Sequence, residues 1–229
     1  MRELADLLPG ISVVTATYNE CESLPILISA IRGLLAGVKH EIIVVDDSST
    51  DGTLEAAKLA DVVVVKKREG QTVALLTGMK MCKFPTVVTI DADLENPPEL
   101  IQVLVRRIVD SDIVVASRVS LPRLSEKVAR VTIGRICGVT DAFSNFRAYN
   151  QAVIKKLKVD CGETFGAEIL VRAKVMGLRV SEVFYAPPRR RRNPRIGGTL
   201  KANMRIMRAV VKSAMLFLHL SLKKTAVWT

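Results

Sequence analysis

The stretch TVVTIDADLENPPEL, residues 86–100, joins a strand-like apolar run to three closely spaced carboxylates. Asp91, Asp93 and Glu95 follow the apolar run, and Pro97 stands where proline is tolerated at the start of a helix. Residues i and i+2 of an extended chain point to the same side, so Asp91 and Asp93 are expected to share one face. Crowded carboxylates repel, and a divalent cation such as Mg²⁺ or Mn²⁺ would remove the conflict. The alternative is that these acidic residues only complement the dipole of the following helix.

Short runs rich in Val and Ile alternate with helix-compatible stretches through the first half of the chain. This alternation is typical of an α/β protein with a mostly parallel sheet flanked by helices. The expected strands span residues 11–16, 41–46, 61–66, 86–91 and 112–116, and the expected helices span 23–35, 52–60, 70–81 and 97–109. Polar clusters follow four of these strands, at 17–20, 46–52, 91–93 and 117–118. Ligands of open sheets bind beyond the carboxyl ends of the strands, so these clusters are expected to face one crevice.

The alternation fades after about residue 121. Helices are expected over 124–136 and 163–176, and a strand is expected over 179–186. The segment PPRRRRNPRIGG, residues 187–198, combines prolines and glycines with five arginines, which predicts an irregular, mobile basic loop.

The region from residue 199 onward reads as one amphipathic helix. Lys201, Arg205, Arg208 and Lys212 fall on one side of it as a basic row, and apolar residues fill much of the remaining surface. A helix of this kind can lie in the plane of a membrane surface. The alternative is a helix packed on the domain with its basic side in water.

The charge and cysteine content exclude several classes of protein. The chain has 229 residues and a net charge of +11, and its 11 excess basic residues all lie after Glu182, where no acidic residue occurs. A nucleic-acid-binding protein would explain this basic end but not the acidic clusters at the strand ends. The four cysteines form no CxxC pair and there are two histidines, so neither a disulfide framework nor a zinc site is indicated. Neither a signal peptide nor a transmembrane segment is expected.

Four motifs resemble the family 2 glycosyltransferases, which have the GT-A (Rossmann-like) fold. They are TATYNE (15–20), VVDDSSTDGT (44–53), REGQTVALLTGM (68–79) and TIDADLENPPEL (89–100). Within that family, ASR (116–118), DAFSNFRAYN (141–150) and FGAEILVRAKVMGLRVSEV (165–183) are most similar to the dolichol-phosphate mannosyltransferases. The match covers roughly residues 11–201. It implies a GT-A catalytic domain over 1–186, followed by the basic loop at 187–198 and the helical region at 199–229.

The resemblance implies roles for individual residues. Those expected to bind the nucleotide sugar are Thr17, Tyr18, Glu20, Asp47, Gly70, Asp91 and Asp93, and those expected to hold Mg²⁺ or Mn²⁺ are Asp91, Asp93 and Glu95. Glu95 stands where the family usually has glutamine. Asp93 and Arg118 are the expected catalytic residues, and the expected acceptor-phosphate and closing-loop residues are Arg118, Ser144, Arg147, Arg195 and Lys201. For Arg118 and Arg147, the alternative is an ordinary ion pair. Asn145 replaces the usual glycine of the family. The backbone there must tolerate a side chain, and Asn does so better than most residues if φ is positive.

The implied reaction is an inverting, metal-dependent transfer of mannose from GDP-mannose to dolichyl or another polyprenyl phosphate, giving a lipid-linked sugar donor for glycosylation. A lipid phosphate is already anionic near neutral pH, so it can attack without a general base. The alternative donors are UDP-glucose and UDP-N-acetylglucosamine. The chain is then expected to be a peripheral enzyme on the cytoplasmic face of a membrane, with the helix or a membrane-anchoring protein holding it there and with no nucleic acid as partner.

Overall fold

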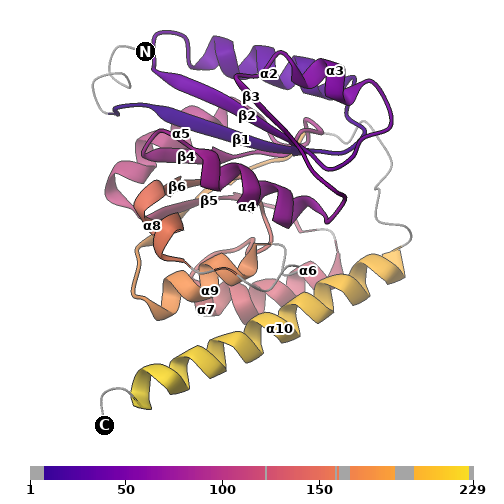
Figure 1. The fold of residues 1–229 in the computed structure, drawn as a ribbon. Helices are drawn as coiled ribbons and strands as arrows, with labels where there is room; N and C mark the ends of the chain where they lie inside the picture. Colours follow the sequence, from indigo (N-terminus) through magenta and orange to yellow (C-terminus); the bar gives the residue numbers. More distant parts are fainter. Residues whose placement is uncertain (1–7, 122, 158, 160–165, 189–198, 227–229) are drawn as a thin grey trace.

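Seven strands form one mixed sheet within the residues that the computed structural model describes, which are 8–121, 123–157, 159, 166–188 and 199–226. The strand order is β3-β2-β1-β4-β6-β5-β7 (Figure 1). The strands are β1 (Ile11–Thr17), β2 (His40–Asp46), β3 (Val62–Val65), β4 (Thr86–Thr89), β5 (Ile113–Arg118), β6 (Arg147–Asn150) and β7 (Val180–Tyr185). The predicted α/β class with a mostly parallel sheet is confirmed.

Strand β6 reverses the direction of the sheet at one place. It pairs antiparallel with both β4 and β5, while every other described pair is parallel. The carboxyl ends of the other six strands and the amino end of β6 therefore lie at the same edge of the sheet. Arg147, the first residue of β6, joins the polar residues of that edge.

Helices cover both faces of the sheet. Alternate strand residues point to opposite faces, and they divide the core into two clusters. One cluster joins β1 residues such as Val13 to α2 (Ser23–Leu34) and α5 (Leu100–Arg107), with the short α3 (Thr53–Ala57) beside α2. The other joins residues such as Val14 to α4 (Gln71–Met81), α8 (Gln151–Lys156), α9 (Ala167–Val175) and α10 (Thr199–Ala226). In Figure 1, α9 and α10 of this second layer lie below the sheet, and α4 crosses in front of it.

Several elements differ from those expected from the sequence. The helix expected over 124–136 consists of α6 (Leu124–Ala129), a π-helical turn η2 (Arg130–Gly134) and α7 (Arg135–Cys137). Helix α5 continues into a 3₁₀ turn η1 (Ile108–Asp110). The sequence did not predict β6 or α8. The predicted basic loop lies largely outside the described residues, and so do the first residues of the helix expected over 163–176.

A helix that crosses a membrane must be both long and apolar. None of the helices in the described part of the chain is both long enough and apolar enough to cross a bilayer, and this includes α10 with its 28 residues.

Candidate active site

The loops that follow β1 and β2 are bonded to each other. The Thr17 hydroxyl donates to Oδ1 of Asp46 over 3.1 Å, and the Ser49 amide donates to the other oxygen of Asp46 over 2.9 Å. The Glu20 amide donates to the Thr53 hydroxyl over 2.7 Å, and the Glu20 carboxylate accepts from Ser23. Thr17 and Glu20 are both buried. Their hydrogen bonds therefore stabilise the conformation of these loops.

Asp47 fixes the segment that follows β3. Its carboxylate accepts from the amides of Glu69 and Gly70 over 2.9 and 2.8 Å and pairs with Nζ of Lys66 over 3.1 Å. Burial alone would raise the pKa of Asp47, but these donors outweigh it and the pKa is lowered. Gly70 adopts φ +96°, which glycine adopts without strain, at the position just before α4.

Tyr18 and Arg68 form a stacked pair at this edge. The Arg68 guanidinium lies 3.7 Å from the centre of the Tyr18 ring and donates to its hydroxyl over 2.9 Å. The pair combines a flat aromatic surface with a cation, which together suit a planar base and an anionic group.

The Asp91 carboxylate is held by two amide side chains. Gln71 Nε2 donates to Oδ1 of Asp91, and Asn96 Nδ2 donates to Oδ2 over 3.1 Å. The hydroxyl of Tyr185 donates to Oδ1 of Asn96 over 2.5 Å, so a buried tyrosine orients the residue that orients Asp91. Burial and then the charge of Asp93 raise the pKa of Asp91 to about 7, against the hydrogen bond from Asn96.

The Asp93 and Glu95 side chains occupy a tight turn after β4. The Glu95 amide donates to Oδ1 of Asp93 over 3.0 Å, and Leu94 between them has φ +61°. Asp91 and Asp93 fit a hard divalent cation because both supply oxygen, and because a cation would offset the burial and the mutual repulsion that raise the Asp91 pKa. In the described part of the chain, no three Asp, Glu, His or Cys side chains form a group that could hold a metal ion. Glu95 therefore does not complete a preformed three-carboxylate site with them.

Arg118, at the end of β5, lies within a network of charges. Its Nε donates to Oδ2 of Asp141 over 2.6 Å, and its Nη2 lies 3.3 Å from Oε1 of Glu126 on α6. Arg118 is also close enough to lower the pKa of Asp91 electrostatically. Arg118 thus forms the ion pairs that the alternative interpretation expected, and it also lies near Asp91.

Arg147 is fully buried at the amino end of β6. Its Nη1 and Nη2 donate to the carbonyl oxygens of Gly166 and Ala142 over 2.8 and 2.9 Å, and its Nε has no hydrogen-bond partner among the described residues. The same part of the chain contains no carboxylate that forms an ion pair with Arg147. Ser144 accepts from the Phe146 amide over 3.3 Å, and Asn145 does not adopt positive φ.

Gly166 makes room for this arginine. It has φ +75°, and a Cβ atom there would lie 2.9 Å from Oδ1 of Asn145 and 3.2 Å from Nη1 of Arg147. The large side chain at 145 and the glycine at 166 therefore fit each other.

Most of the residues proposed from the sequence meet at one edge. Hydrogen bonds link Asp47 to Gly70, and Gly70 is followed by Gln71, which bonds to Asp91. Arg195 lies outside the described residues, and so does the side chain of Lys201. Sequence reasoning did not identify Gln71, Asn96 or Tyr185. Gln71 lies within the quoted motif REGQT and could have been found, whereas the contact of Tyr185 with Asn96 joins residues 89 apart and left no local signal.

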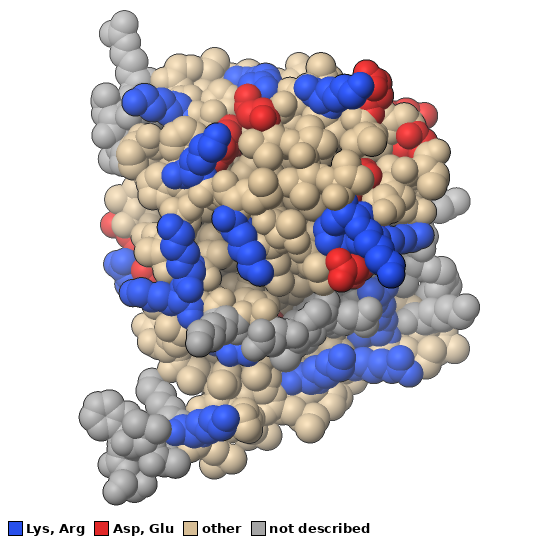
Figure 2. Space-filling model, in the orientation of Figure 1, with Lys and Arg blue, Asp and Glu red and all other residues tan. Residues whose placement is uncertain are grey.

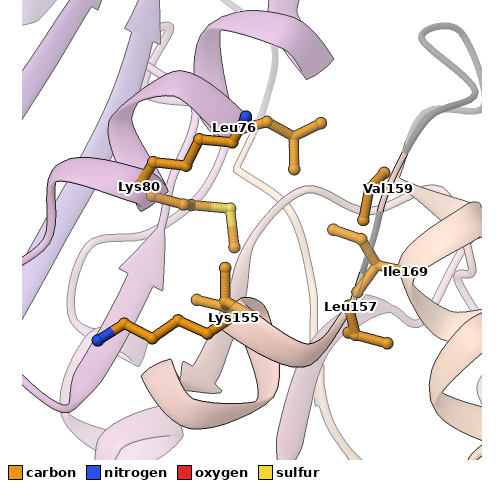
Figure 3. Close-up of a pocket in the computed structure, with 8 residues that line it drawn as sticks. Leu76, Lys80, Lys155, Leu157, Val159 and Ile169 are labelled. Carbon is orange, nitrogen blue, oxygen red and sulfur yellow. The ribbon is translucent and has the colours of Figure 1, made fainter.

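A separate hollow of about 420 Å³ lies between α4, α8 and α9 (Figure 3). Its walls are mostly apolar, including Leu76, Leu157 and Ile169, and Lys80 and Lys155 also line it. Leu76, Met79 and Lys80 belong to the carboxyl half of α4, while Gln71 begins this helix. The hollow therefore does not mark the candidate site.

The arrangement of the sheet is shared with solved structures. Glucosyl-3-phosphoglycerate synthase of Mycobacterium tuberculosis matches with a TM-score of 0.75 at 21% identity, over 93% of this chain and 82% of that chain. That structure contains Mn²⁺, UDP and phosphoglyceric acid, and another structure of the same protein contains Mg²⁺ and UDP. At this identity the likeness shows the fold, which is GT-A.

Acidic and basic side chains gather at the carboxyl edge of this fold, and the sequence comparisons identify the chain as a glycosyltransferase. A family model described as Glycosyl transferase family 2 matches residues 12–167, more than half of the chain, and the chain belongs to this family. A dolichol-phosphate mannosyltransferase of Pyrococcus furiosus is 33% identical over 186 residues, which are 72% of this chain and 53% of that protein. An undecaprenyl-phosphate 4-deoxy-4-formamido-L-arabinose transferase of Pseudomonas fluorescens is 34% identical over 162 residues, 63% of this chain and 48% of that protein. The chain spans about half the length of these curated relatives.

Proposed function

We propose that the chain transfers a sugar from a nucleoside diphosphate sugar to a polyprenyl phosphate, with GDP-mannose and dolichyl phosphate as the first pair to test. The observation that carries the proposal is the Asp91–Asp93 pair at the carboxyl edge, where the charge of Arg118 acts on Asp91 and where Arg147 pairs with Thr89 on the neighbouring strand. Both curated relatives described above are named for transfer to a polyprenyl phosphate. Their names support the acceptor class.

The donor is proposed to bind on the β3-β2-β1-β4 side of the edge. Tyr18 and Asp47 face the base and ribose there, while Thr17, Glu20 and Gly70 shape the loops around them. Asp91 and Asp93 would hold Mg²⁺ or Mn²⁺, and Glu95 would join them only by moving when the ion binds. The ion would neutralise charge on the leaving diphosphate. Gln71 and Asn96 keep the Asp91 carboxylate in one orientation.

The acceptor phosphate is proposed to bind on the β6-β5 side. Arg147 contributes a positive charge that no carboxylate of the described residues cancels, and Ser144 lies beside it at the same strand end. Arg118 contributes a cation whose orientation Asp141 and Glu126 fix, and Arg195 and Lys201 are proposed to close over the site. A phosphate oxygen attacks the anomeric carbon, the bond from that carbon to the diphosphate oxygen breaks, and the nucleoside diphosphate leaves with the electron pair. One displacement inverts the configuration without a covalent enzyme intermediate.

A UDP-sugar is the second candidate donor. The solved neighbours with the same fold contain UDP or UDP-glucose. The acidic and basic groups described above do not distinguish the two bases.

The test is a lipid-extraction assay with a matched control. The purified chain, Mn²⁺ and a polyprenyl phosphate are incubated separately with labelled GDP-mannose, UDP-glucose and UDP-N-acetylglucosamine. We expect label in the lipid phase from one donor and a loss of at least 100-fold in Asp93→Asn, but wild-type rates in Asp110→Asn, an exposed carboxylate on η1. Absence of label in the lipid with every donor contradicts the proposed acceptor.

A binding measurement separates the metal assignment from turnover. Mn²⁺ with GDP or UDP is expected to raise the melting temperature of the wild type and of Asp110→Asn, but not that of Asp91→Asn or Asp93→Asn. Equal shifts in all four proteins would overturn the assignment of Asp91 and Asp93 to the metal.

A further inference from the structure

Helix α10 has two apolar faces, and the domain uses only one of them. Ala202, Ile206, Ala209, Val210 and Ser213 are buried and pack toward α6, η2 and α9. The Ser125 hydroxyl on α6 also bonds to the Asn203 side chain over 2.5 Å. The sequence offered two alternatives for this helix, packing on the domain or lying on a membrane surface. They do not exclude each other, because α10 packs on the domain and also keeps an exposed amphipathic surface.

The second apolar face points away from the domain. Its seven side chains are between 37% and 73% exposed, and they are Leu200, Met204, Met207, Val211, Met215, Leu218 and Leu222. They follow one another at 4, 3, 4, 4, 3 and 4 residues, and at about 100° per residue they all fall opposite the buried face. This row, the outer apolar stripe, extends along most of a helix of 28 residues, about 42 Å long. Figure 1 shows α10 crossing the lower side of the molecule, with its carboxyl half extending past the domain.

The spacing of the outer apolar stripe keeps it on one side of a nearly straight helix. Its positions repeat every 11 residues, or about 3.67 residues per turn, close to the 3.6 of a straight helix. The stripe therefore stays on one side of α10 along its length. A left-handed coiled coil with a second copy of the chain would need a repeat of 3.5 residues per turn, which this sequence does not keep. A right-handed coiled coil suits an 11-residue repeat, but it would bring the basic residues of two copies together, and α10 has no acidic residue to pair with them.

Basic side chains flank the outer apolar stripe on one side. Arg205, Arg208, Lys212 and Lys223 are exposed, and α10 contains no acidic residue. Figure 2 shows basic side chains along the lower part of the molecule, where α10 runs. A long apolar stripe with cations along its border matches the interface of a bilayer that carries anionic lipid, with apolar groups at the acyl boundary and cations at the headgroups.

We propose that the outer apolar stripe of α10 docks the domain on an anionic membrane surface, with α10 in the plane of the interface. The buried face of the same helix holds the domain above it, so membrane binding requires no unfolding or release of α10. Helix α6 lies against α10 and carries Glu126, the partner of Arg118. The docked helix would therefore support the same side of the sheet edge as Arg118. This inference rests on the surface of α10 and not on the proposed reaction.

The test is flotation of the full chain with vesicles, without nucleotide sugar. Vesicles of phosphatidylcholine with about 30% phosphatidylglycerol are compared with vesicles of phosphatidylcholine alone. We expect binding to the anionic vesicles, at least tenfold weaker binding of Met215→Gln/Leu218→Gln, and unchanged binding of the control Leu54→Gln/Leu59→Gln, which alters exposed leucines of similar accessibility near α3. Arg208→Gln/Lys212→Gln is expected to bind about 30-fold more weakly, as 0.5 M salt does for the wild type.

Light scattering of the same proteins without vesicles separates the other possible occupants. The membrane proposal expects the same mass for the wild type and for Met215→Gln/Leu218→Gln. A wild-type dimer that this double substitution converts to monomer would assign the stripe to a second copy of the chain. That result, or wild-type binding to anionic vesicles by the stripe variant, would overturn the proposal. Circular dichroism of each variant checks that the helix is intact.

Discussion

At the scale of single residues, Asp47 and Asp91 lie at the same sheet edge, but their surroundings shift their pKa values in opposite directions. Asp47 receives two backbone amides and a lysine, and its pKa is lowered. Burial and the neighbouring charge of Asp93 raise the pKa of Asp91 to about 7, although the Asn96 side-chain amide donates to it. The hydrogen bonds and the lysine therefore stabilise the ionised form of Asp47 without any ligand. Asp91 lacks such compensation and is suited to bind a cation that arrives with the substrate.

The stability contributed by Asp47 is expected to depend on pH. Its pKa is lower in the folded state, so its contribution is complete above the unfolded pKa of about 4 and is lost as the pH falls through the folded value. Asp47→Asn is expected to lower the free energy of unfolding by about 2 kcal/mol at pH 7, and by less near pH 3. Urea unfolding at both values checks this, with Asp110→Asn as the control. A difference between wild type and Asp47→Asn that stays constant with pH would refute the assignment.

Tyr185 is expected to act on the metal through Asn96. Tyr185→Phe removes the donor to Asn96 and frees its side chain to turn away from Asp91, so Mn²⁺ affinity in the presence of the nucleotide is expected to fall about tenfold. Isothermal titration calorimetry measures the effect, and Tyr149→Phe is the matched control in another buried tyrosine. Equal Mn²⁺ affinity in wild type and Tyr185→Phe would show that Tyr185 has no part in holding Asp91.

At the scale of elements, the close approach of α4 to the sheet couples packing to the site. A Cβ atom on Gly78 would lie 2.5 Å from Cγ1 of Val14 and 3.0 Å from Cγ2 of Val45. Any side chain there would move α4, and α4 begins with Gln71. The fit between one glycine and two valines therefore sets the distance of a donor to Asp91.

Gly78→Ala is expected to destabilise the protein by about 1–2 kcal/mol. Overpacking costs about 1–3 kcal/mol and the gain in helix propensity offsets up to about 1 kcal/mol of it. Gly33→Ala in α2 has no atom within 4 Å of its added Cβ, so it keeps only the propensity gain and is expected to leave the protein equally or more stable. Urea unfolding of both variants gives the comparison. Equal effects of the two substitutions would show that α4 can move away from β1 and β2 at little cost in free energy.

Elements with a strong local pattern were predictable, and those defined by their neighbours were not. The runs that became β1, β2, β4 and β5 are apolar and lead into polar clusters, so both the strands and their active edge were visible in the sequence. Strand β6 has four residues and begins with a buried arginine, which no periodicity reveals. Helix α10 was predictable as a helix, but the split of its apolar residues into two faces depends on where the domain touches it.

At the scale of the whole molecule, the sheet brings two groups of residues together across the β4–β6 boundary. The loops after β1, β2 and β3 carry the proposed donor-binding residues, and β5 and β6 carry Arg118 and Arg147. The sequence placed Arg118 and most of the donor-binding residues at strand ends, but it predicted neither β6, which begins with Arg147, nor its position between β4 and β5. That strand order, and with it the neighbourhood of Asp91, Arg118 and Arg147, required the structure.

The insertion of β6 also affects how the chain is made. Strands β1 to β4 pair only with one another until β6 joins β4, so this half of the sheet can form early in synthesis. Strand β5 pairs with β6 and β7, both of which are later in the chain. Until residues 147–150 leave the ribosome, an almost wholly apolar strand has no partner in the sheet. While residues 119–146 are being made, β5 therefore exposes an unpaired apolar strand, and we expect the nascent protein to be prone to aggregation in this interval.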